Sequence, residues 1–400
     1  MKHTAIVLVF VIPALMACQS SKKKPDPISQ PIPTSDPQTF NGSMKELQDT
    51  LTRVLPLVAD NSQYNAPENQ KQIQADVKRM LELSKKVSHS PSVALKDPSV
   101  TFISKAFSED LEKIDESLAM GKRDFARYNL MNVTAYCIEC HVRTSTGPSF
   151  RSPALEQTLK KLSGLERSEF LISTRQFEAA LKELSTFIDD RLKEKNDFFA
   201  LDKAVRYALA VTVKYLKDPK RSLEVARKIS KASGIPYYLK QNAIGWETAI
   251  QDWMKEPKPK DFSSAAVLKR VRGWMSKGQQ LEVGMVDRGG DIYFLRALSD
   301  LHVIMATPLK PEEAGESLYL TGLAYEAMRD QSLWNLHENY YEACIRKVPH
   351  STWSQKCFKR YEESIYFGFT GSSGVRLPED VIHRLQKLRD LAFEPGQAPE

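Results

Sequence analysis

Residues 123–143, RDFARYNLMNVTAYCIECHVR, decide the fold of the first part of the chain. Leu130, Val133, Cys137 and Cys140 follow one another at steps of three and four residues. This spacing places them on one face of an α-helix, because the helix completes a turn in about 3.6 residues. The stretch therefore predicts one amphipathic helix, and the segments before it decide what that helix packs against.

Three stretches with the same periodicity precede it. In the first of them, Leu47, Leu51, Val54 and Val58 again recur every three or four positions. Gly121 ends the third, as glycine often does just beyond a helix. The four predicted helices cover residues 43–60, 67–87, 100–120 and 123–143. Four helices joined by short loops predict an up-down four-helix bundle, which we assign to a domain spanning residues 39–150.

The fourth helix carries a C-x-x-C-H motif formed by Cys137, Cys140 and His141. This is the attachment signature of c-type haem: two thiols on one helix face add to the two vinyl groups, and the histidine binds the iron. A thioredoxin-type redox pair would need a βαβ setting, and a zinc site would need a second Cys/His pair where only His89 is near. We therefore expect one covalently bound haem c.

Two further stretches relate this region to a known family. Residues 43–47, SMKEL, look like the start of the first helix in the cytochrome c-prime and four-helix b-type cytochrome family, and residues 119–124, AMGKRD, match its turn into the fourth helix. The resemblance covers about residues 40–145. It implies that Met44 is the sixth iron ligand opposite His141, and that the domain transfers electrons.

Other residues compete for the roles around the iron. A methionine in an amphipathic stripe commonly serves packing alone, and an empty sixth position would let small gases bind. Arg143 and Arg127 lie near the motif and are candidates to pair with the haem propionates. The alternative sixth ligands are Met80, Met120, Met131 and His89.

The N-terminus predicts export. An apolar run over residues 5–16 is too short to span a bilayer but fits a signal-peptide core. It ends at Ala17-Cys18, which resembles a bacterial lipobox, so residues 1–17 would be a signal peptide and Cys18 the lipidated first residue. Gln19 is not the Asp that retains lipoproteins at the inner membrane, so we expect the periplasmic face of the outer membrane, with the inner membrane as the alternative. An ordinary secretory signal with an incidental cysteine also fits. Residues 18–38, rich in Pro, Ser and Lys, would form a tether.

From residue 165 to about 395 the pattern remains helical. Residues 175–181, RQFEAAL, and 322–325, GLAY, resemble parts of tetratricopeptide repeats, although no strict 34-residue period emerges. We expect a tetratricopeptide-like α-solenoid that binds a protein or peptide, with a non-repetitive helical bundle as the alternative. The predicted helices are 165–174, 176–192, 197–217, 219–232, 236–254, 261–277, 289–306, 311–330, 333–347, 352–368 and 378–393.

Cys344 and Cys357 flank a turn between two of these helices. In an oxidising compartment such a pair predicts a disulfide across the helical hairpin. The alternative is a pair of buried free thiols.

Composition limits the remaining function classes. The chain has 400 residues, a net charge of +7 and only 17 glycines, which favours an all-α protein. The sequence has no basic stripe interleaved with aromatic residues, which would predict nucleic-acid binding. It also has no catalytic triad, phosphate loop or carboxylate pair, which would predict an enzyme. We expect a lipid-anchored periplasmic c-type cytochrome that exchanges electrons with a redox partner protein. The alternative is an envelope scaffold whose haem is structural or senses redox state or gas. Bundle cytochromes of this type often form homodimers.

Overall fold

The computed structural model describes residues 40–88, 98–143, 153–162, 164–282, 287–328, 335–372 and 374–393. Within these ranges the chain is all-α apart from one small hairpin. The predicted signal peptide, Cys18, the predicted tether and His89 lie outside the described residues. None of the described helices is both long and apolar enough to cross a bilayer.

The first helices pack around one another as an antiparallel group. α1 packs on α3, α3 on α5, α5 on α6, and α6 packs back against α1. The helices of this part are α1 (Phe40–Ala59), α2 (Asn61–Asn65), α3 (Pro67–Ser88), α5 (Pro98–Ala119), α6 (Arg123–Asn132) and α7 (Thr134–His141). Their apolar stripes supply the buried side chains between them, among them Leu51, Val77, Leu111 and Leu130.

The single helix expected over 123–143 is wrong, because the structure divides it into α6 and α7. The amide of Val133 bonds to the carbonyl of Leu130, three residues back, instead of continuing the four-residue ladder. Val133 and Thr134 are consecutive β-branched residues, which fit the crowded helix surface less well than unbranched ones. Beyond the break, α7 contacts α9 as well as α5.

The remaining helices pack mainly on their neighbours in sequence. They are α8 (Pro153–Lys161), α9 (Gly164–Ser173), α10 (Phe177–Glu194), α11 (Phe198–Leu209), the π-helical turn η1 (Ala210–Tyr215), α12 (Pro219–Ser230), α13 (Tyr237–Lys255), α14 (Ser264–Gln280), α15 (Asp291–Met305), α16 (Pro311–Met328), α17 (Leu336–Lys347), α18 (Thr352–Gly368) and α19 (Glu379–Ala392). A two-residue hairpin, β1 (Thr370–Gly371) with β2 (Gly374–Val375), separates α18 from α19.

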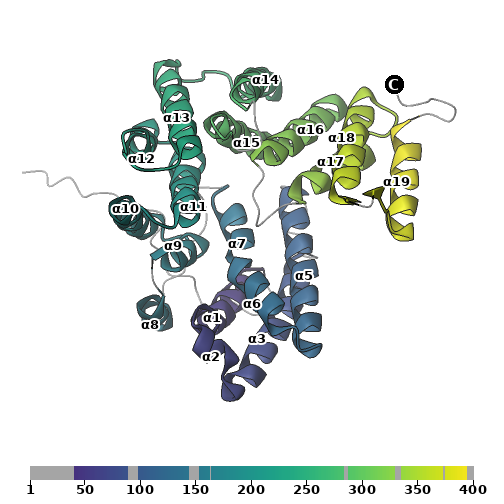
Figure 1. Cartoon of the computed structure of the whole chain (residues 1–400). Helices are drawn as coiled ribbons and strands as arrows, with labels where there is room; N and C mark the ends of the chain where they lie inside the picture. The colour runs from purple at the N-terminus through teal and green to yellow at the C-terminus, as the bar shows by residue number, and fades with distance from the viewer. Residues whose placement is uncertain are drawn as a thin grey trace, which may run out of the picture.

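These later helices form an arc over the first group (Figure 1). Both ends of the arc reach it, since α9 contacts α7 and α17 contacts α5. The close packing inside the arc is visible at Gly322 of α16, where a Cβ atom would collide with the ring of Tyr341 on α17. Buried apolar residues of both groups form one continuous cluster. The elements before and after residue 150 therefore share a core.

Candidate functional site

α7 brings the three residues of the C-x-x-C-H motif to one cavity. Cys137, Cys140 and His141 all line it, together with residues of α1, α3 and α5 and the turn after α9. The cavity has a volume of about 80 Å³ and is open to solvent on one side. The other lining residues are Met44, Leu47, Gln48, Leu51, Met80, Ser84, Val87, Ile103, Ser104, Phe107, Val133, Tyr136, Ser173 and Thr174.

The imidazole of His141 is held in a defined state. Its Nδ1 lies 2.6 Å from the carbonyl oxygen of Ser173. A carbonyl only accepts hydrogen bonds, so Nδ1 carries the proton and Nε2 keeps a free electron pair. Burial, with the nearby Arg175 cation, lowers the pKa of His141 to about 4, so the ring is neutral at neutral pH. Histidines that bind metal ions through Nε2 are commonly oriented by this type of hydrogen bond.

Arg175 also holds the backbone at His141 in place. Its guanidinium donates a 3.0 Å hydrogen bond to the backbone carbonyl of His141 and lies over the ring of Phe177. Its backbone has a φ of 59°, which is uncommon for a side chain other than glycine. Ser173 and Arg175 thus orient the motif from beyond the predicted bundle. The sequence carries no signal for Ser173, because only its backbone carbonyl is used.

The two cysteines of the motif are not joined in a disulfide. Burial, together with the neighbouring Cys140, raises the pKa of Cys137 to about 12. The thiolate is the reactive form of cysteine in disulfide exchange, so a raised pKa disfavours a spontaneously active redox pair. The described residues also contain no group of three His, Cys, Asp or Glu side chains arranged for a metal ion, so a zinc site finds no further ligands there.

Of the methionines considered as the sixth iron ligand, two line the cavity. Met44 of α1 and Met80 of α3 both line the cavity with His141. Met80 is fully buried, whereas Met44 is half-buried. Met120 is 66% exposed at the end of α5, and Met131 packs on the core without lining the cavity.

Neither arginine expected near the propionates is among the residues that line the cavity. Arg127 donates to the backbone carbonyls of Val58 and Ala59, which joins α6 to the end of α1. Arg143 lies two residues beyond His141, just after the end of α7. Its buried guanidinium instead bonds to Glu139 and to residues of the later helices.

The donor set and the lining fit a haem. Two thiols and a neutral imidazole share one wall, a methionine faces the cavity from α1, and most of the remaining lining is apolar, as a porphyrin requires. Gln48, Ser84, Ser104 and Thr174 supply the polar part of the lining. When bound, haem c would be held by Cys137 and Cys140, with His141 as its iron ligand.

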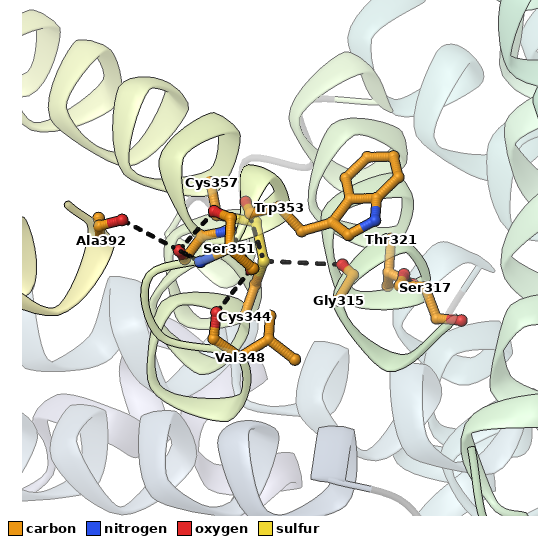
Figure 2. Close-up of a disulfide and its surroundings, with 10 residues drawn as sticks. Gly315, Ser317, Thr321, Cys344, Val348, Ser351, Trp353, Cys357 and Ala392 are labelled. Carbon is orange, nitrogen blue, oxygen red and sulfur yellow. Dashed lines mark hydrogen bonds between the residues drawn. A yellow bond between two sulfur atoms is a disulfide. The ribbon is translucent and has the colours of Figure 1, made fainter. Parts of the chain in front are cut away.

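The disulfide expected from the spacing is present. Cys344 of α17 and Cys357 of α18 are joined, with their Cα atoms 6.3 Å apart (Figure 2). Both cysteines are fully buried. Ser351 caps α18 in the turn between them, and its hydroxyl accepts from the amide of Ser354. The bridge therefore fixes the hairpin of α17 and α18 that contacts α5.

Comparisons with known proteins found no match: no family model, no curated protein and no solved structure is significantly similar to this chain.

Proposed function

We propose that this chain is an exported c-type cytochrome with one covalent haem, acting in electron transfer. The observation that carries the proposal is the arrangement of the C-x-x-C-H motif. All three of its residues line one largely apolar cavity, and the 2.6 Å hydrogen bond from Nδ1 of His141 to the Ser173 carbonyl makes Nε2 the unprotonated ring nitrogen, the form that binds iron. A disulfide exchange site does not require the oriented histidine, and within the described part of the chain a zinc site would lack its further ligands.

Each residue has a defined part in this proposal. Cys137 and Cys140 hold the porphyrin as thioethers, and His141 binds the iron. Met44 is the proposed sixth ligand, from the first helix of a four-helix haem domain. Ser173 and Arg175 orient the histidine. The haem supplies one-electron redox chemistry, and the largely apolar lining limits contact with water, which together with a His/Met pair raises the potential.

The rest of the chain fits a lipid-anchored protein with a binding surface. We propose that Cys18 is lipidated after export, so that residues 18–38 tether the protein to the outer membrane. The helices from α9 onward, which pack successively on one another, support a tetratricopeptide-like solenoid that binds the redox partner. The buried disulfide between Cys344 and Cys357 supports an oxidising compartment.

The absorption spectrum tests this function. The mature chain is produced with the haem c maturation machinery, and its spectrum is recorded oxidised, reduced, and reduced with carbon monoxide. We expect a low-spin spectrum that carbon monoxide does not change, because a filled sixth position suits electron transfer. A high-spin spectrum that shifts with carbon monoxide would contradict electron transfer with a filled site and would favour gas binding or sensing.

A further inference from the structure

A group of buried charged and polar side chains lies behind the haem-binding motif. Glu139 stands between the two cysteines but points to the opposite side of α7, since it is two residues, or about 200°, from His141. Its Oε1 accepts a 2.6 Å hydrogen bond from Nζ of Lys214 and a 3.1 Å bond from Nη2 of Arg143. The Tyr325 hydroxyl also donates to this oxygen. We call these four residues, with His302 and Tyr340, the Glu139 cluster.

The Glu139 cluster joins α7 to four later elements. Lys214 comes from the π-helical turn η1, His302 from α15, Tyr325 from α16 and Tyr340 from α17. Arg143 donates to the hydroxyls of Tyr325 and Tyr340 at 3.0 and 3.1 Å. Its Nη1 lies 3.3 Å from Nδ1 of His302. The cluster thus occupies the contact between the haem-binding helix and the arc.

The cluster carries one surplus positive charge. Burial lowers the pKa of His302 well below its usual value, and the Arg143 and Lys214 cations lower it further, so this ring is neutral. Burial raises the pKa of Tyr325 well above its usual value, so its hydroxyl is neutral too. Two basic side chains, Arg143 and Lys214, therefore face the single carboxylate of Glu139. Burial lowers the pKa of Lys214, and the Glu139 carboxylate, whose Oε1 lies 2.6 Å from Nζ, opposes this lowering. The side chains of both cations are 1% exposed.

Water and salt screen such charges little, because the cluster lies in the protein interior. Oxidised haem iron carries one more positive charge than reduced iron. A fixed positive charge nearby therefore disfavours the oxidised state and raises the reduction potential. Removing a cation must lower the potential, and removing the carboxylate must raise it.

We propose that the Glu139 cluster sets the reduction potential of the haem through its surplus positive charge. Glu139, Arg143 and Lys214 do not line the cavity and would act as positioning and electrostatic residues. The inference rests on the proposed function, since it requires a haem on Cys137 and Cys140. It adds that the later helices, through Lys214, take part in tuning that haem.

The test compares Glu139→Gln, Lys214→Met and the double variant in the full haem-loaded chain. Each potential is measured by titration with dithionite and ferricyanide, and folding is checked by circular dichroism. We expect Glu139→Gln to raise and Lys214→Met to lower the potential, each by a shift on the order of tenfold in the reduction equilibrium, or about 59 mV for one electron. The double variant has the same net charge as the parent and should return close to its potential.

Two matched variants separate charge from structure. Tyr325→Phe removes a hydrogen bond from the same carboxylate without changing charge, so its shift should be much smaller. Arg296→Met removes a buried cation of α15 that pairs with Glu256 outside the cluster, and it should leave the potential near that of the parent. If Glu139→Gln does not fold, the double variant compared with Lys214→Met gives the same information, because these two differ only at Glu139.

The outcomes distinguish the inference from the proposed function. Shifts of opposite sign that cancel in the double variant support the inference. Shifts of the same sign, no shift, or an equal shift in Tyr325→Phe overturn the inference while haem binding and the proposed function stand. A chain that takes up no covalent haem overturns the proposed function and the inference with it.

Discussion

Replacing each of the two cavity-lining methionines by alanine separates a ligand from a packing residue. Met80 is 1% exposed in the core between α1, α3 and α5, whereas Met44 is half-buried near the start of α1. If Met44 binds the iron, Met44→Ala should open the iron to carbon monoxide with a modest loss of stability. Met80→Ala should leave the iron closed to carbon monoxide and cause a larger loss of stability.

The burial of each methionine side chain sets the expected loss of stability when it is replaced by alanine. Truncating a fully buried methionine costs about 2–5 kcal/mol, because the lost transfer free energy is joined by a cavity. A half-buried side chain loses less contact with the protein, so Met44→Ala should cost about 1 kcal/mol before the loss of the iron bond. Leu47→Ala is the matched control, since Leu47 is a half-buried cavity residue one turn further along α1 that cannot bind iron.

Two assays read these effects independently. Guanidinium unfolding followed by circular dichroism gives the stability change, and the carbon monoxide difference spectrum reports an open sixth position. The interpretation is refuted if Met80→Ala opens the iron while Met44→Ala leaves the spectrum unchanged. It is also refuted if Leu47→Ala opens the iron as fully as Met44→Ala, since the spectrum would then report a loosened cavity.

Three further predictions concern stability. The Cys344–Cys357 disulfide closes a loop of about 14 residues, so replacing both cysteines by alanine should cost roughly 3 kcal/mol in urea unfolding, and a reductant should have no further effect on that variant. Gly322→Ala places a Cβ against an aromatic ring of α17 and should destabilise the chain by about 1–3 kcal/mol in thermal unfolding. In the control Gly273→Ala, in α14, the added Cβ meets open space, so this variant should be more stable by up to about 1 kcal/mol. A hydrogen bond from an arginine of α3 lowers the pKa of Glu46 in the folded chain. The ionised carboxylate therefore stabilises the fold at any pH above the pKa that Glu46 has in the unfolded chain. This contribution is lost as the pH falls through the lower pKa of the folded chain. Glu46→Gln should therefore cost up to about 1 kcal/mol at pH 7 in chemical unfolding and progressively less in acid; a cost that grows with acidity would contradict the sign.

The helices could be predicted because their apolar stripes are regular. The expected segments 67–87, 311–330 and 352–368 agree with α3, α16 and α18 to within two residues at each end. The sequence analysis did not predict α2 or α8 as helices, nor the π-helical turn η1. α2 has only five residues and depends on the cap that Asp60 provides, and η1 continues α11 with a change of hydrogen bonding that periodicity does not reveal.

The candidate site could be predicted only where its residues are local in sequence. The spacing of the C-x-x-C-H motif is enough to place its three residues on one helix. Met44 is far from the motif in sequence and was proposed from the resemblance of residues 43–47, and the structure places it around the same cavity. The Glu139 cluster could not be found in this way, because Lys214 is 75 residues and Tyr325 is 186 residues from Glu139. Arg143 was expected beside the haem because it is close to His141 in sequence, but beyond the end of α7 its guanidinium bonds to Glu139, Tyr325 and Tyr340.

The most direct test of the account is the mass of the mature chain isolated from cells that attach haem c to exported proteins. The account predicts one added haem, located on the peptide that contains residues 137–141 and absent from the Cys137→Ser/Cys140→Ser variant. Unmodified thiols at both positions in the folded protein would contradict the assignment of this cavity to a haem.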